Sequence, residues 1–191
     1  MRSLKSTGGF TLMEVMMALA FFMVVSAMSL AVVSSAVPTI RVNSQINRLL
    51  GLLQLAREEA IAKQRDVLLT FDEDTSTIQI VRLVAGQEVW VQTVTFEYGV
   101  KFMRFDGTGD TPDGYGAASN IDFNGATQTL FISDGSLVDE ASIPVNGTIY
   151  IGIDGHPETG RAITITGSTA RARFYEWAPG SSLWETGWVG K

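Results

Sequence analysis

The chain has 191 residues, of which 46% are hydrophobic and 18% charged, which is enough for one globular domain and one membrane segment but not for two large domains. It contains no cysteine, so disulfides, a thiol nucleophile and cysteine-bound metals are excluded. The net charge is −6, and when Arg2, Lys5 and Glu14 of the N-terminal region are set aside, 12 basic and 19 acidic residues remain, a balance that disfavours binding of nucleic acid or anionic lipid.

The first element is an apolar stretch over residues 10–37, interrupted only by small hydroxyl residues and Glu14. As a helix it would be about 42 Å long, which is enough to cross a hydrocarbon core of about 30 Å. Arg2 and Lys5 are the only charges before it, so the positive-inside rule keeps the N-terminus in the cytoplasm and directs the rest of the chain outward.

Glu14 is an ionisable side chain within this stretch, where insertion costs roughly 2.5–3.5 kcal/mol and a partner is required. One reading is that the carboxylate lies near the helix end and reaches the headgroups. The other is that it pairs with a cationic group of a neighbouring molecule, which would set the register of helices packed side by side.

Glycines precede the apolar stretch. Gly8 and Gly9 stand directly before Phe10, and Glu14 is the fifth residue counted from Phe10, whereas a secretory signal has its cleavage site after a shorter apolar region. The arrangement resembles the class III leader of type IV prepilins and pseudopilins. The resemblance implies that residues 1–9 are a leader, that a membrane prepilin peptidase cuts between Gly9 and Phe10, and that the new amino group of Phe10 is methylated. The apolar helix is then kept, and the Phe10 ammonium of one subunit can pair with Glu14 of the next.

Residues 38–66 are predicted to continue the stem as an amphipathic helix. Pro38 lacks a backbone donor and is expected to bend or interrupt the helix. Apolar residues then recur at alternating spacings of four and three, which predicts one buried face. The stripe consists of Val42, Ile46, Leu49, Leu53, Ala56 and Ala60. Arg65 and Asp66 are expected to close the helix.

From residue 67 the period of the pattern changes to two, which predicts strands. After the β-rich run 67–71, about seven short strands are expected, at 77–83, 89–96, 100–105, 129–132, 148–153, 162–166 and 171–177. Turn residues at 72–75, 85–86, 134–135, 146–147 and 154–155 favour antiparallel hairpins. The predicted fold class is α+β: a long N-terminal α-helix, membrane stem plus amphipathic half, packed on a C-terminal antiparallel β-sheet domain of residues 67–191.

Residues 106–120 form a glycine-rich segment that is predicted to be a mobile surface loop. Its carboxylates Asp106, Asp110 and Asp113, with Asp122 nearby, are weak candidates for calcium ligands, since the spacing does not fit an EF-hand loop. The sequence has no phosphate-binding glycine loop, serine elbow or histidine-glutamate metal pattern.

The only histidine, His156, lies in a turn-rich connection, which favours a surface role over catalysis. No catalytic site and no cofactor are therefore predicted. A membrane-anchored enzyme of the cell envelope remains the alternative class, and it would keep residues 1–9.

Three stretches resemble the GspH/FimT family of minor pilins: Leu-Ala-Arg-Glu-Glu-Ala-Ile at 55–61, Phe-Ile-Ser-Asp-Gly-Ser at 131–136 and Arg-Ala-Ile-Thr-Ile at 161–165. The resemblance covers nearly the whole chain. It implies the pilin fold and a non-enzymatic minor pseudopilin that helps to initiate or cap a filament, either a type II secretion pseudopilus or a type IV pilus. The implied partners are other pilins or pseudopilins, the prepilin peptidase, the inner-membrane assembly platform and, before assembly, membrane lipid. The implied location is the bacterial inner membrane, crossed once, with the C-terminal domain in the periplasm.

Pilus-type members of this family can carry a Gly-Arg-x-Arg motif that binds DNA, and Ala170-Arg171-Ala172-Arg173 stands at the matching positions. Strand alternation would place Arg171 and Arg173 on one face, spaced for successive phosphates. The alternative is a solvated strand face that pairs with nearby carboxylates. The acidic balance and the missing glycine favour this alternative over DNA.

The C-terminal segment 177–188 is rich in aromatic residues. Its rings are expected either to cover a sheet edge or the helix of the same subunit, or to contact another pilin.

Overall fold

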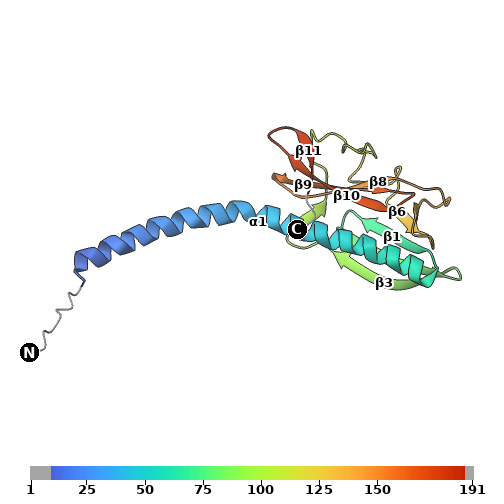
Figure 1. Ribbon diagram of the computed structural model, residues 1–191, viewed down its shortest axis with the longest axis horizontal. Coiled ribbons are helices and arrows are strands. Elements are labelled where there is room, and N and C mark those ends of the chain that lie inside the picture. The colour runs from blue at the N-terminus through green and yellow to red at the C-terminus, as the bar shows by residue number, and fades with distance from the viewer. Residues whose placement is uncertain (1–9, 188–191) are drawn as a thin grey trace, which may run out of the picture. The chain divides into compact units, whose positions relative to one another are not determined.

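The computed structural model describes residues 10–187, without the side chains of residues 30–35. The chain divides into two compact units that meet between Val37 and Pro38. Helix α1 (Leu12–Lys63) runs through both units (Figure 1). Its first part, residues 12–37, belongs to the first unit, and its second part, residues 38–63, belongs to the second unit. Pro38 lies inside α1, so the expected interruption of the helix is wrong: one missing donor does not end it.

Both ends of α1 are capped. At the start, the backbone N–H of Glu14 donates to the hydroxyl of Thr11 at 3.3 Å, which makes Thr11 the N-cap. At the end, Gln64 has a left-handed φ of 51°, and the N–H of Arg65 donates to the carbonyl of Ala60 at 3.2 Å. These two features form a Schellman motif. The helix therefore ends at Lys63, slightly before the predicted end at Arg65 and Asp66.

Within residues 10–187, eleven strands form two antiparallel sheets. They are β1 (Val67–Asp72), β2 (Thr77–Val84), β3 (Gln87–Thr95), β4 (Val100–Phe102), β5 (Ile121–Asp122), β6 (Gln128–Phe131), β7 (Leu137–Val138), β8 (Gly147–Ile153), β9 (His156–Thr166), β10 (Arg171–Ala178) and β11 (Leu183–Thr186). The first sheet has the order β3-β2-β1-β6-β7, and the second has the order β11-β10-β9-β8-β4 with β5 paired to β8. The strands that were not predicted are mostly short: β5 and β7 have two residues each.

The second part of α1 packs on both sheets through the predicted stripe. All six stripe residues are at most 4% exposed. They share one apolar core with residues of the first sheet, such as Leu69 and Ile80, and of the second sheet, such as Ile149 and Ile163. The α+β class, with a helix packed on antiparallel sheets, is therefore confirmed.

Four of the five predicted turns are present, among them Ala85-Gly86 between β2 and β3 and Asp154-Gly155 between β8 and β9. The fifth, Asn146-Gly147, is wrong. Gly147 opens β8, and a Cβ there would overlap the ring of Phe123. The Asn146 side chain accepts a hydrogen bond from the N–H of Gly167 at 2.9 Å. These two residues therefore serve close packing and a long-range hydrogen bond.

Candidate functional site

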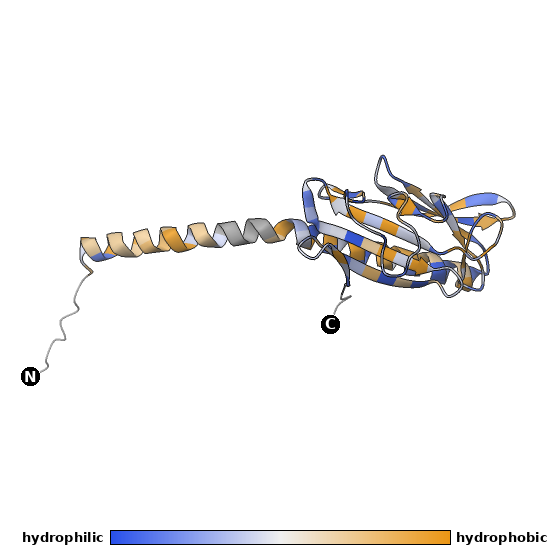
Figure 2. Cartoon of the chain, turned by 90° about the horizontal axis from the view of Figure 1, so that it is seen from above, coloured by the Kyte–Doolittle hydropathy of each residue, from blue (hydrophilic) through white to orange (hydrophobic). Residues whose placement is uncertain are grey.

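The N-terminal unit carries the predicted assembly residues that the structure describes. Its segment Leu12–Ser29 is long and apolar enough to cross a membrane, and its residues are coloured predominantly as hydrophobic in Figure 2. Within residues 10–29 and 36–187, the Glu14 carboxylate makes no hydrogen bond or ion pair. Glu14 lies on an exposed apolar face of the helix together with Phe10, Val15, Ala18, Leu19 and Phe22. Gly9, on the other side of the predicted cleavage point from Phe10, lies outside the described residues.

Arg171 and Arg173, the candidate DNA contacts, have different surroundings. Arg173 pairs with the carboxylate of Asp113, whose side chain is only 8% exposed. Asp113 also accepts a hydrogen bond from the hydroxyl of Thr164 at 2.5 Å. Arg171 instead lines a groove beside α1. For Arg173 the structure thus agrees with the alternative of pairing with a local carboxylate.

The electrostatics of Asp113 follow from these contacts. Burial acts to raise the pKa of Asp113, but hydrogen bonds from Thr164, Tyr175 and Arg173, together with the Arg173 charge, outweigh it and hold the pKa below its usual value. The Arg173 side chain is 45% exposed, whereas Asp113 is hydrogen bonded at both carboxylate oxygens, by Thr164 and by Arg173. Arg173 is consequently engaged within the chain itself.

The segment 106–120 lies over the second sheet and is fastened to it. The hydroxyl of Tyr150 on β8 donates to the carbonyl of Gly116 at 3.0 Å, and the indole of Trp184 on β11 donates to the carbonyl of Gly109 at 2.9 Å. The side chains of Tyr150, Ala162 and Tyr175 form a small apolar cluster separate from the main core. The expected free surface loop is therefore a cover on the face of this sheet that points away from α1.

Two of the three carboxylates of this segment, Asp110 and Asp113, are used within the fold. Asp110 accepts hydrogen bonds from the N–H groups of Thr111 at 2.7 Å and Gly116 at 3.1 Å, while Asp113 faces Arg173. Within residues 10–187, no three histidine, aspartate or glutamate side chains come together as a possible metal site. Asp106 and Asp122, the remaining calcium candidates, are likewise not part of any such cluster in residues 10–187.

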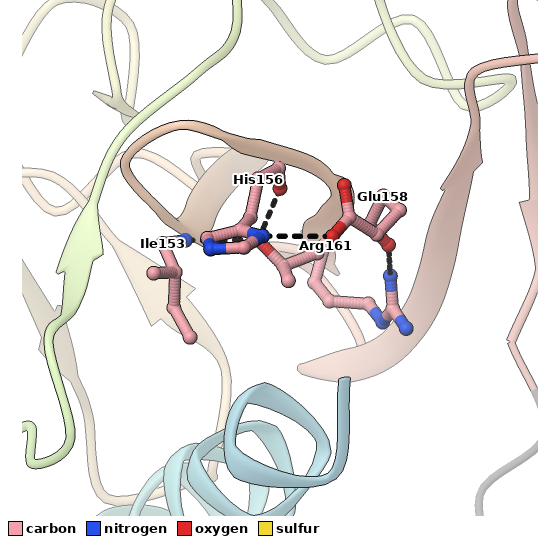
Figure 3. A network of polar contacts seen from close by, with 5 residues as sticks. Ile153, His156, Glu158 and Arg161 are labelled. Carbon is pink, nitrogen blue, oxygen red and sulfur yellow. Dashed lines mark hydrogen bonds and ion pairs between the residues drawn. The ribbon is translucent and has the colours of Figure 1, made fainter. Parts of the chain in front are cut away.

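His156 is the first residue of β9, not part of a loop, and it belongs to a network that organises the β8–β9 hairpin (Figure 3). Its Nδ1 lies 2.9 Å from the Glu158 carboxylate. The hydroxyl of Thr159 donates to the His156 carbonyl at 2.6 Å and accepts from the N–H of Ile153 at 2.9 Å. These contacts shape the turn and give His156 a structural role.

Arg161, which the sequence did not single out, links β9 to α1. It is 2% exposed, and its Nε donates to the side-chain oxygen of Asn43 at 3.0 Å. Its Nη1 donates to the carbonyls of Glu158 at 3.0 Å and Gly160 at 2.9 Å. Burial lowers the pKa of Arg161, against the opposing effect of the Glu176 carboxylate. The sequence signal was an arginine at the start of the Arg-Ala-Ile-Thr-Ile stretch, whose other residues are apolar or threonine.

The aromatic C-terminal segment packs on its own chain as far as the structure describes it. Strand β11 pairs with β10. The rings of Trp177 and Trp184 lie 5.2 Å apart, and those of Tyr150 and Trp184 lie 5.7 Å apart. The prediction that these rings cover the same subunit is confirmed up to residue 187, and Trp188 lies outside the described residues.

Comparison with known proteins gives one family. Residues 45–173 match the family described as type II transport protein GspH. The crystal structure of the type IV minor pilin FimU of Pseudomonas aeruginosa is similar, with 18% identity, a TM-score of 0.50, and coverage of 73% of this chain and 90% of FimU. The minor pseudopilin EpsH from the type 2 secretion system of Vibrio cholerae gives 19% identity, a TM-score of 0.45, and coverage of 73% and 96%. No curated protein matches the chain. At this identity the likeness to FimU supports the predicted pilin fold and nothing beyond it.

Proposed function

Because this chain belongs to the family of the type II transport protein GspH, we propose that it is a minor pseudopilin, a non-enzymatic subunit of a type II secretion pseudopilus or a type IV pilus. The observation that carries the proposal is the family match over residues 45–173, which includes most of the second part of α1 and strands of both sheets. The apolar segment Leu12–Ser29 supports a single membrane crossing.

In this proposal the subunit waits in the bacterial inner membrane with residues 1–9 in the cytoplasm and the C-terminal domain in the periplasm. The prepilin peptidase removes the leader after Gly9 and Phe10 is methylated. The stem then leaves the lipid because neighbouring stems replace its lipid contacts. The unfavourable burial of Glu14, roughly 2.5–3.5 kcal/mol, is offset by pairing with the Phe10 ammonium of the adjacent subunit. Other pseudopilins and the assembly platform are the partners.

Leader processing is the first test. The full-length chain is produced in cells with and without an active prepilin peptidase, and its intact mass and N-terminal sequence are measured. We expect a chain that begins at methylated Phe10 only when the peptidase is active. A chain that still begins at Met1 beside an active peptidase would revive the alternative of an anchored envelope protein.

Glu14 tests the assembly step. Glu14→Ala and Glu14→Gln should leave folding of the C-terminal domain unchanged and greatly reduce entry into filaments, because both variants lack the charge that pairs with the neighbour. Ser29→Ala is the matched control. It alters another polar residue of the apolar segment, whose hydroxyl already donates to the Val25 carbonyl at 3.0 Å. Normal incorporation of Glu14→Ala into sheared filaments would contradict the register argument.

DNA binding is the alternative function, and the contacts of Arg173 argue against it. The carboxylate of Asp113 already neutralises Arg173 and is also bonded to Thr164, so a phosphate that approached Arg173 would meet a negative charge beside it. A gel shift at low salt, where phosphate contacts are strongest, should therefore show no band that depends on Arg171 and Arg173. A salt-sensitive complex that is lost in the double alanine variant would favour the DNA-binding function.

A further inference from the structure

A groove of about 440 Å³ opens along one flank of α1, where the helix meets the ends of strands β6, β9 and β10. Leu53 of α1, Phe131 at the end of β6 and Ile165 near the end of β9 all line it. Each of these three side chains is at most 4% exposed and belongs to the main core. The floor of the groove is therefore apolar and is held in place by the packing of the domain.

Two arginines and two amides lie around this floor: Asn47, Gln54, Arg57 and Arg171. The Nε of Arg57 donates to the carbonyl of Gly135 at 3.1 Å, which orients the guanidinium. No aspartate or glutamate lines the groove. The groove is thus cationic in a chain with 20 acidic and 14 basic residues.

The two arginines differ in their ion pairing from four of the seven other arginines in residues 10–187. Arg48, Arg82, Arg161 and Arg173 each lie within 4 Å of a carboxylate. Among the residues that the structure describes, no carboxylate lies that close to Arg57 or Arg171. A guanidinium binds a carboxylate in a planar, two-bonded geometry, so these two groups are suited to carboxylates from another molecule.

The length of the groove indicates the shape of its ligand. On α1 the lining residues run from Asn47 to Arg57, which at 1.5 Å per residue is about 15 Å. An extended peptide covers this distance in four or five residues at about 3.3 Å each. The length and the apolar floor fit an extended segment better than a compact anion.

We propose that this groove binds an extended acidic segment of a neighbouring protein subunit, with an apolar side chain on the floor and carboxylates on Arg57 and Arg171. The proposal rests on the proposed function, in which such neighbours exist. Buried apolar anchors and paired arginines supply much of the binding energy at protein interfaces. The fixed floor and the hydrogen bond to Gly135 reduce the ordering needed when the segment binds.

The test uses the full-length chain in detergent micelles and a displayed library of random 12-residue peptides. We expect the enriched peptides to carry aspartate or glutamate on both sides of an apolar residue, and to lose affinity when those acids become asparagine or glutamine. Arg57→Ala and Arg171→Ala should each weaken binding roughly tenfold or more. Arg48→Ala and Arg173→Ala are matched controls on the same helix and the same strand, and should leave binding unchanged.

A further variant, Gln54→Trp, fills the groove from an exposed helix position and should block binding without removing a core side chain. Urea unfolding confirms that each variant is folded. The proposal is overturned if no acidic peptides are enriched, or if Arg173→Ala weakens binding as much as Arg171→Ala. The proposal would also be overturned if duplex DNA displaced the peptides and if Arg171→Ala and Arg173→Ala weakened DNA binding equally. The surface would then be one that binds nucleic acid. Because binding is measured on purified protein, its failure is separate from failure of leader processing or assembly.

Discussion

Arg161→Met tests the connection between α1 and the second sheet. Methionine keeps an apolar stem of similar length but removes donors to three acceptors, the Asn43 side chain and the carbonyls of Glu158 and Gly160. Glu158 is exposed, so its carbonyl can turn to water. The other two acceptors are less accessible to water. Leaving each of them without a hydrogen bond lowers the free energy of unfolding by about 1–3 kcal/mol. Relief from burying the guanidinium offsets part of this loss. The expected destabilisation is therefore about 2–4 kcal/mol.

Two further variants separate the contributions. Asn43→Ala removes one hydrogen bond and should destabilise by about 1 kcal/mol. Glu176→Gln should cost less than about 1 kcal/mol, because the two groups are 3.7 Å apart and the Glu176 side chain is 40% exposed. The predicted order of destabilisation is Arg161→Met, then Asn43→Ala, then Glu176→Gln.

The assay is urea unfolding of the full-length chain in detergent micelles, followed by tryptophan fluorescence. All four tryptophans lie beyond residue 66, so the signal reports the β-rich part of the chain. If Arg161→Met destabilised by less than about 1 kcal/mol, or stabilised as replaced buried ions sometimes do, the reasoning that the guanidinium ties β9 to α1 would be refuted.

Two other variants test the packing and the pH response. Gly147→Ala places a Cβ against the Phe123 ring and should lower the free energy of unfolding by about 1–3 kcal/mol. The control Gly109→Ala has open space around its position and should leave stability unchanged. Equal urea midpoints for the two variants would contradict the close approach of Gly147 to Phe123. The lowered pKa of Asp113 means that its stabilising contribution is fully present above its ordinary pKa of 3.8 and is lost as the pH falls through the lower value in the folded chain. Asp113→Asn should reduce the acid dependence of unfolding below about pH 4, and an unchanged pH profile in the urea titration would count against the assigned contacts.

Local sequence patterns predicted those features of the fold that depend on neighbouring residues. The stripe from Val42 to Ala60 follows the helical period, and all six of its members are buried. Ala85-Gly86 forms its turn because both residues adopt a positive φ there. The two-residue strands β5 and β7 are too short to show any period, so they could not be predicted in this way.

Features that depend on distant contacts were not predictable. The division into two sheets is an example, since β1 pairs with both β2 and β6. The different surroundings of Arg171 and Arg173 are another: one lines a groove with α1, and the other meets a carboxylate 60 residues away. Spacing alone therefore suggested a shared role for two residues that the folded chain separates.

The segment between β4 and β5 forms a third layer of the C-terminal domain. Its attachments to the second sheet stand at fixed offsets along the chain: Gly109 to Trp184, Asp113 to Thr164 and Gly116 to Tyr150. A single inserted or deleted residue between these points would misalign at least one attachment. Although it has no regular secondary structure, this segment is therefore length-restricted. An epitope tag or a reporter insertion is better placed elsewhere, such as the exposed turn at Gly180 and Ser181.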